Sequence, residues 1–131
     1  MENTYFEKVR NFLLELEYVI ESEDNEDQVF VVSRIDDGIN NMIVAVADPI
    51  LIFEQYLFDV KNEDNALFKR LLMKNRDIIH GAFVLDDSGK KVLFRDTLQI
   101  ENLDLNEIEG SLNSLSLLLS EFSDELIKYA K

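Results

Sequence analysis

The chain has 131 residues, 47% of them hydrophobic and 31% charged, with four glycines and one proline, a composition that excludes a linker or a disordered tail and predicts a single domain over 1–131. It has no cysteine, which excludes disulfides and thiolate metal sites and fits a reducing compartment. The formal net charge of -14 disfavours nucleic acid as a ligand, because binding to phosphates needs a cationic surface.

A first amphipathic helix is predicted over about 4–16, because apolar residues recur there at helical spacing after the capping-box pattern of Thr4 and Glu7. Seven acids and no base then fall within 15–27, which indicates a short extended piece followed by an exposed loop. This acidic run contains no glycine, and a calcium-binding loop needs one for its sharp turn. We therefore interpret it as a solvated loop and not as a calcium site.

Three strands are predicted next, because the chain becomes rich in β-branched and aromatic residues and is divided by two turn signals, Asp36-Asp37-Gly38 and Asp48-Pro49. Their connections are too short for the crossover that parallel neighbours require, so an antiparallel meander is expected. The predicted strands cover about 29–35, 41–47 and 50–58.

These strands carry more apolar side chains than one buried face can use, and the middle strand is apolar on both faces. Three explanations are open: helices cover both faces, the surplus forms a dimer interface, or it binds a protein client. For the last case the candidate partner-binding residues are Phe30, Val32, Met42, Val44, Phe53 and Leu57.

A second helix is predicted over about 64–76, with Leu67, Leu71 and Leu72 on its apolar side. It is the only basic helix of the prediction, and it offers a candidate dimer interface to an acidic surface of another subunit. The basic residues concerned are Lys69, Arg70, Lys74 and Arg76.

Two further strands, about 82–86 and 91–100, flank the hairpin signal Asp86-Asp87-Ser88-Gly89. The second of them alternates between apolar and mixed positions, which indicates one buried face. Asp104 and Glu107 then form a capping pair that opens the longest helix, roughly 105–130. Its apolar residues follow a heptad spacing, so both a coiled coil and a helix that covers the sheet are open, and the serines along it favour the cover.

No catalytic, cofactor-binding or metal-binding residue is predicted. His80 is the only histidine, and its place beside Gly81 at a strand entry favours a structural role. The acid pairs Asp36-Asp37 and Asp86-Asp87 lie in turns beside glycine, where Asp is used for local backbone hydrogen bonds. The glycines are not clustered, so there is no phosphate-binding loop of either common pattern.

The predicted order is helix, three strands, helix, two strands, helix: an α+β fold with a twisted antiparallel sheet and packed helices. With this order, several segments make the chain resemble the YbjN-like family, which is similar in fold to the class I type III secretion chaperones, including the Tir chaperone type. The resemblance covers most of the chain and is strongest over about 65–130. The segments are Leu71-Leu72-Met73-Lys74-Asn75, Gly81-Ala82-Phe83-Val84-Leu85-Asp86, Gly89, Leu98 and Leu103-Asp104-Leu105.

This resemblance implies a small acidic cytoplasmic protein, commonly a homodimer, that binds protein clients and has no enzymatic activity. It does not imply secretion. Some relatives look like companions of membrane-stress proteins of the phage-shock-protein-A type, which offers one class of partner.

We therefore expect a non-enzymatic protein-binding module, chaperone-like or adaptor, that uses apolar sheet surface. The alternative is a small regulatory ligand-binding protein or enzyme with an unrecognised site. The acidity serves either solubility or the steering of a basic partner. The chain opens Met1-Glu2-Asn3 without a basic and apolar leader and has no long apolar run, so a cytoplasmic location without membrane insertion is expected.

Overall fold

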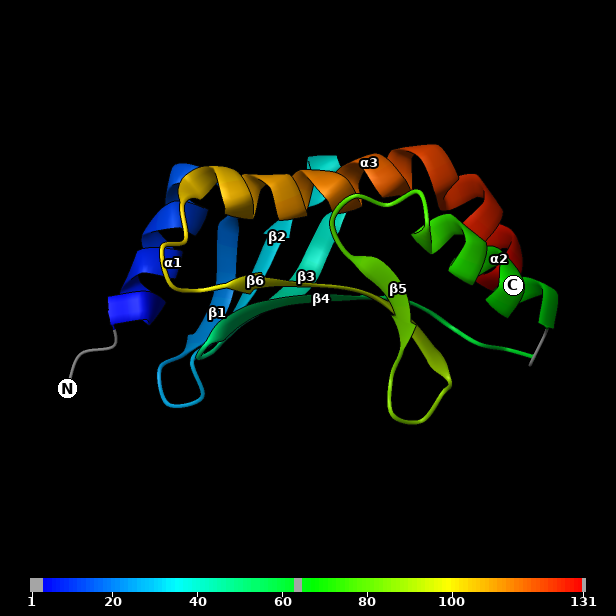
Figure 1. Cartoon of the computed structure of the whole chain (residues 1–131), viewed down its shortest axis with the longest axis horizontal. Helices are drawn as coiled ribbons and strands as arrows, with labels where there is room; N and C mark the ends of the chain where they lie inside the picture. The colour runs from blue at the N-terminus through cyan, green and yellow to red at the C-terminus, as the bar shows by residue number, and fades with distance from the viewer. Residues whose placement is uncertain (1–3, 63–64, 131) are drawn as a thin grey trace.

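The structure, a computed structural model, describes residues 4–62 and 65–130. Three α-helices lie on one side of a six-stranded antiparallel sheet, and no described helix lies on the other side (Figure 1). A short 3-10 turn, η1 (Ile35–Asp37), joins the second and third strands. The elements are α1 (Thr4–Glu15), β1 (Val19–Asp24), β2 (Val29–Arg34), β3 (Ile39–Ala47), β4 (Ile50–Asp59), α2 (Asn65–Asn75), β5 (Ala82–Leu85), β6 (Lys91–Gln99) and α3 (Leu105–Ala130).

The predicted α+β class and antiparallel sheet are confirmed. The five predicted strands correspond to β2 through β6, and the strand order across the sheet is β1-β2-β3-β4-β6-β5. The predicted meander of β2, β3 and β4 is therefore confirmed. β6 lies between β4 and β5, so β5 is at the edge of the sheet. The sheet consequently has two edge strands, β1 and β5. The start predicted for α2 at residue 64 lies outside the described residues.

One strand differs from the sequence-based interpretation. The segment 19–24, expected as an extended piece that leads into a loop, is the edge strand β1 and pairs with β2. Four of its six residues are polar, so its composition gives no strand pattern. The strand is stabilised by contacts with other elements: its backbone pairs on one side with β2, and Glu23 forms an ion pair with Arg10 of α1.

The core lies between the helices and the sheet. Helix α3 runs along the sheet and buries its heptad positions there, with Ile108, Leu112 and Leu115 at most 1% exposed. The prediction that this helix covers the sheet is thus confirmed. Asp104 caps it, because its carboxylate accepts a hydrogen bond from the backbone N–H of Glu107 at 2.9 Å. At the other end of the sheet, Phe6 of α1 stacks on Phe30 of β2 with ring centroids 4.2 Å apart.

Helix α2 packs beside β5 through Leu67 and Leu71, which are buried. Leu72, which the sequence placed on the same apolar side, is 69% exposed and points away from the core. The prediction for this residue is wrong, because the helix lies at the margin of the sheet and its narrow buried face, with Leu67 and Leu71, does not include Leu72.

A glycine fixes the entry into β5. Gly81 has φ of +90°, and a Cβ at this position would overlap the aromatic ring of Phe94 on the neighbouring strand. Only glycine combines this backbone conformation with this close approach. The Gly-Ala-Phe segment noted in the sequence therefore begins with a residue that the packing of β5 on β6 requires.

Candidate protein-binding surfaces

The candidate client residues lie on the covered side of the sheet. Five of them, Phe30, Val32, Met42, Val44 and Phe53, are at most 1% exposed, and they form the core beneath the helices. Leu57 is partly buried and lines a small hollow against α3. The interpretation of these side chains as an accessible surface is therefore corrected: in the folded chain a partner cannot reach the five core residues.

The opposite side of the same strands is accessible and also apolar. Side chains alternate along a strand, and residues paired across strands share a face. Val31 pairs with Ile43, and Ala45 pairs with Ile52, so these side chains stand together on the side without helices. Tyr56 and Leu93 pair on the same side further along. We call this surface the open face; its apolar members are Val29, Val31, Ile43, Ala45, Ala47, Ile50, Ile52, Tyr56, Ala82, Val84 and Leu93.

The open face is solvent-accessible to different degrees. Ile43 is 44% exposed and Tyr56 52% exposed, while their apolar neighbours are half-buried among one another. An ion pair crosses the middle of the face, where Arg95 of β6 donates to Glu54 of β4 at 2.9 Å. The face is thus largely apolar in its middle strands, with Glu54 and Arg95 neutralising each other. Thr97 of β6 and, at the β1 edge, Ser22 and Asp24 add polar side chains to the same side.

A second polar group borders the open face at the end of β4. The phenol of Tyr56 donates to Asp59 at 2.9 Å, and Lys91 donates to the same carboxylate oxygen at 3.0 Å. The hydrogen bond from Lys91 lowers the pKa of Asp59, and the bond to Asp59 raises the pKa of Tyr56. These contacts hold the half-exposed tyrosine ring in place on the face.

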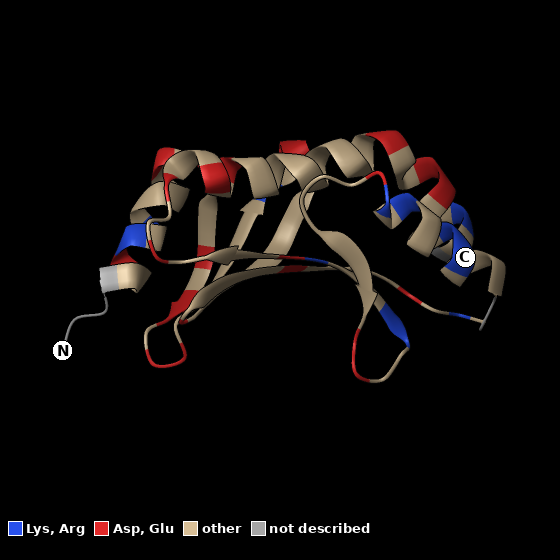
Figure 2. Ribbon diagram, viewed as in Figure 1, with Lys and Arg blue, Asp and Glu red and all other residues tan. Residues whose placement is uncertain are grey.

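Two hairpin turns project from the sheet on the side of the open face (Figure 2). The turn between β1 and β2 is acidic, with Asp24, Glu26 and Asp27, and Asp24 accepts two local backbone N–H groups. In the other turn Asp86 accepts from Ser88 and from nearby backbone, which lowers its pKa. The prediction that Asp86 serves turn geometry is confirmed by these local bonds.

The basic residues of α2 divide into two groups. Arg70 pairs with Glu125 of α3 at 2.6 Å, and both Arg70 and Lys74 lie over the ring of Phe122. These two side chains are therefore engaged within the chain. Lys69 and Arg76 are exposed. In Figure 2 the blue of α2 stands against the red of the end of α3.

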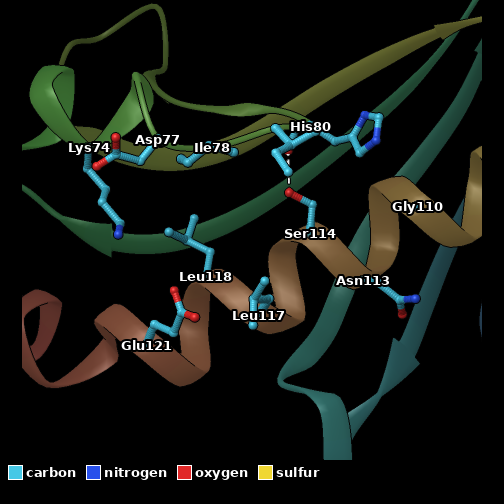
Figure 3. Close-up of a pocket in the computed structure, with 11 residues that line it drawn as sticks. Lys74, Asp77, Ile78, His80, Gly110, Asn113, Ser114, Leu117, Leu118 and Glu121 are labelled. Carbon is cyan, nitrogen blue, oxygen red and sulfur yellow. Dashed lines mark hydrogen bonds between the residues drawn. The ribbon is translucent and has the colours of Figure 1, made fainter.

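His80 lies at a hollow of about 240 Å³ between the loop after α2 and helix α3 (Figure 3). The hydroxyl of Ser114 donates to the backbone oxygen of His80 at 2.6 Å and not to its ring. The arrangement therefore does not place a nucleophile against a base. Exposed apolar side chains, Ile79 and Leu117, contribute to the lining.

The described part of the chain contains no group of three or more His, Asp or Glu side chains that could hold a metal ion. Of the helices described, none is both long and apolar enough to cross a membrane.

Comparison with solved structures shows the fold in other proteins. The chain is similar to YbjN of E. coli, described as a putative transcription regulator, with a TM-score of 0.72, 15% identity and 92% of each chain covered. A chain of the HopA1–SchA chaperone–effector complex matches with a TM-score of 0.67 and 12% identity, over 95% of this chain and 98% of that one.

The Yersinia pestis type III secretion chaperone SycH, in complex with a stable fragment of YscM2, provides a further match, with a TM-score of 0.56, 19% identity and the same shares covered. No curated protein sequence matches the chain. The predicted resemblance to YbjN and to the type III secretion chaperones is confirmed. A family model, CesT_Tir_1, matches residues 2–131, nearly the whole sequence. The chain belongs to the CesT_Tir_1 family.

Proposed function

We propose that this protein is a non-enzymatic, cytoplasmic, chaperone-like or adaptor module that binds a segment of a protein client on the open face of its sheet. The observation that carries the proposal is that the open face is apolar and no described helix covers it. A monomeric soluble protein rarely leaves such a sheet face exposed to water unless a partner covers it. The proposed client surface is therefore the side of the meander opposite to the buried Phe30, Val44 and Phe53.

The charges support a client that is apolar with basic flanks. The chain has a net charge of -14, and the acidic β1–β2 turn projects on the side of the open face. Opposite charge speeds the encounter of two proteins and excludes acidic competitors. Because Arg95 already neutralises Glu54 inside the face, the steering charges are those at its border.

Structural neighbours support a protein as the ligand. One of them is part of a chaperone–effector complex, and another is a type III secretion chaperone bound to a protein fragment. We do not extend the secretion role to this chain. The membrane-stress proteins of the phage-shock-protein-A type are a client class for the same binding assay to test.

Two other functions are not favoured. The E. coli neighbour is described as a putative transcription regulator, but the charge of -14 opposes direct contact with DNA phosphates. A ligand-binding or enzymatic role would need a hollow with polar groups free to act on a ligand. The hollow at His80 is smaller than the roughly 300 to 1,000 Å³ of common small-molecule pockets. A second hollow of about 350 Å³ is lined by Glu54, Asp86 and Arg95, but Glu54 and Arg95 pair with each other and Asp86 is bonded within its turn.

We also propose a homodimer in which α2 meets the other subunit. Leu72 and Met73 of α2 are 69% and 56% exposed, and Lys69 and Arg76 flank them with positive charge in an acidic protein. Light scattering coupled to size exclusion should give about twice 15.2 kDa. Exchanging Lys69 and Arg76 for Glu should weaken the dimer, and a monomer mass for the unmodified chain would contradict the proposal.

Capture of the client tests the open face. Ile43→Asp places a carboxylate in the middle of the face, where an apolar client would have to bury it, and this costs several kcal/mol. We expect capture from a lysate of the source organism to fall at least about tenfold, or about 1.4 kcal/mol. The matched control is Ile35→Asp, because Ile35 is 66% exposed in η1, away from the open face. Equal capture by both variants would contradict the proposal.

A further inference from the structure

The last residue of α2 forms two hydrogen bonds with the backbone of one residue of β5. The backbone N–H of Phe83 donates to Oδ1 of Asn75 at 2.7 Å, and Nδ2 of Asn75 donates to the carbonyl oxygen of Phe83 at 3.2 Å. One carboxamide thus satisfies both the donor and the acceptor of the same residue. In an antiparallel sheet, a residue of the neighbouring strand would offer this same pair of groups.

Phe83 is one of the two residues of β5 at which a further strand would pair. The backbone N–H of Asp86 donates to the oxygen of Lys91 on β6 at 3.1 Å. Because the direction of these bonds alternates along a strand, Val84 points to β6, whereas Phe83 and Leu85 point to the free edge. β5 has only four residues, so Phe83 provides half of the outward pairing positions of this edge.

Packing holds Asn75 in this position. One helical turn earlier, Leu71 is buried against the core, which fixes the end of α2. On the other side, Phe83 is 5% exposed and packs against the ring of Phe122 of α3, with centroids 5.9 Å apart. The sequence pattern of Leu71-Leu72-x-x-Asn75 followed by Gly-Ala-Phe therefore has a physical reason: the leucine anchors the helix, and the asparagine closes the strand.

We propose that Asn75 closes the β5 edge against the addition of a strand from another chain. Exposed sheet edges are templates for pairing, and proteins commonly cover or interrupt them. A second copy or a client then reaches this end of the molecule through side chains and cannot extend the sheet. The inference does not depend on the proposed client site, because it concerns one edge strand and not the open face.

Hydrogen exchange at single amides tests this inference. In the unmodified protein, the amide of Phe83 should exchange slowly. In Asn75→Ala it should exchange about tenfold faster, as expected for the loss of one hydrogen bond at a sheet edge. The matched control is Asn106→Ala, an exposed asparagine of α3, which should leave the exchange of Phe83 unchanged. Unchanged exchange in Asn75→Ala would overturn the proposal.

Self-association provides the second readout. Light scattering should give Asn75→Ala a mass that exceeds that of the unmodified chain and grows with concentration, because the edge is open. Faster exchange with the same mass at every concentration would overturn the role in strand addition. If Asn75→Ala does not fold, the two outward amides of β5 in the unmodified chain are compared. The amide of Leu85 does not face the Asn75 side chain, so slower exchange at Phe83 than at Leu85 supports the proposal, and equal exchange overturns it.

Discussion

Two adjacent residues of β3 should respond very differently to the same substitution. Val44 is fully buried beneath the helices, and Ile43, its neighbour in sequence, is 44% exposed on the open face. Burial of a valine side chain stabilises a fold by about 1.5 to 3 kcal/mol, and an unpaired carboxylate in its place costs several kcal/mol more. Val44→Asp should therefore lose about 5 kcal/mol or more, a loss comparable to the whole stability of a small domain.

Ile43→Asp should lose only about 1 kcal/mol, because its carboxylate stays in water and only part of the apolar contact disappears. Urea unfolding followed by circular dichroism measures both free energies of unfolding. We expect a cooperative transition for Ile43→Asp near that of the unmodified protein, and a largely unfolded Val44→Asp. If Val44→Asp were as stable as Ile43→Asp, the assignment of the two faces of the sheet would be refuted.

The packing at the entry of β5 and the charges beside the open face give two further predictions. Gly81→Ala should destabilise the protein by about 2 to 4 kcal/mol, because the added Cβ overlaps the ring of Phe94 and the backbone conformation is strained. Gly89→Ala, with φ of +73° but open space around it, should cost only about 1 to 2 kcal/mol. Equal midpoints of the two variants in thermal unfolding would contradict this difference. Because the pKa of Asp59 is lowered, its contacts stabilise the fold above about pH 4 and are lost as the carboxylate is protonated; because the pKa of Tyr56 is raised, its contact stabilises the fold below about pH 10 and is lost as the phenol ionises. In an NMR titration, Lys91→Ala should raise the pH midpoint of Asp59. An unchanged midpoint would contradict the role of the lysine.

The elements that pack against the core were predictable because their apolar residues recur with the period of the element. Helix α3 is the clearest case, since most of its heptad residues are buried, namely Ile108, Leu112, Leu115, Phe122 and Leu126. Strand β1 was not predictable in the same way. It pairs along one side only, and its acids need no buried face, so Glu21 and Asp24 are compatible with a strand and with a loop.

The sequence did not show which face of the sheet the helices cover, because that depends on how the strands are paired. In β3 and β4 both faces are apolar, so neither strand alone tells which side the helices cover. The polar residues of β6 hold that information: Arg95 and Thr97 must point to water, and their partners in β4, Glu54 and Ile52, must share that side. The side of β4 that faces water therefore follows from the pairing of β6 with β4, whereas a hairpin of β5 and β6 alone would say nothing about the meander.

The central claim, that the open face holds the client, is tested most directly by a photo-cross-linking amino acid incorporated in living cells of the source organism. Placed at position 43 it should form a covalent adduct with another protein, and placed at position 35, exposed away from that face, it should form none. Adducts from position 35 alone, or a client that is captured without any adduct from position 43, would contradict the claim.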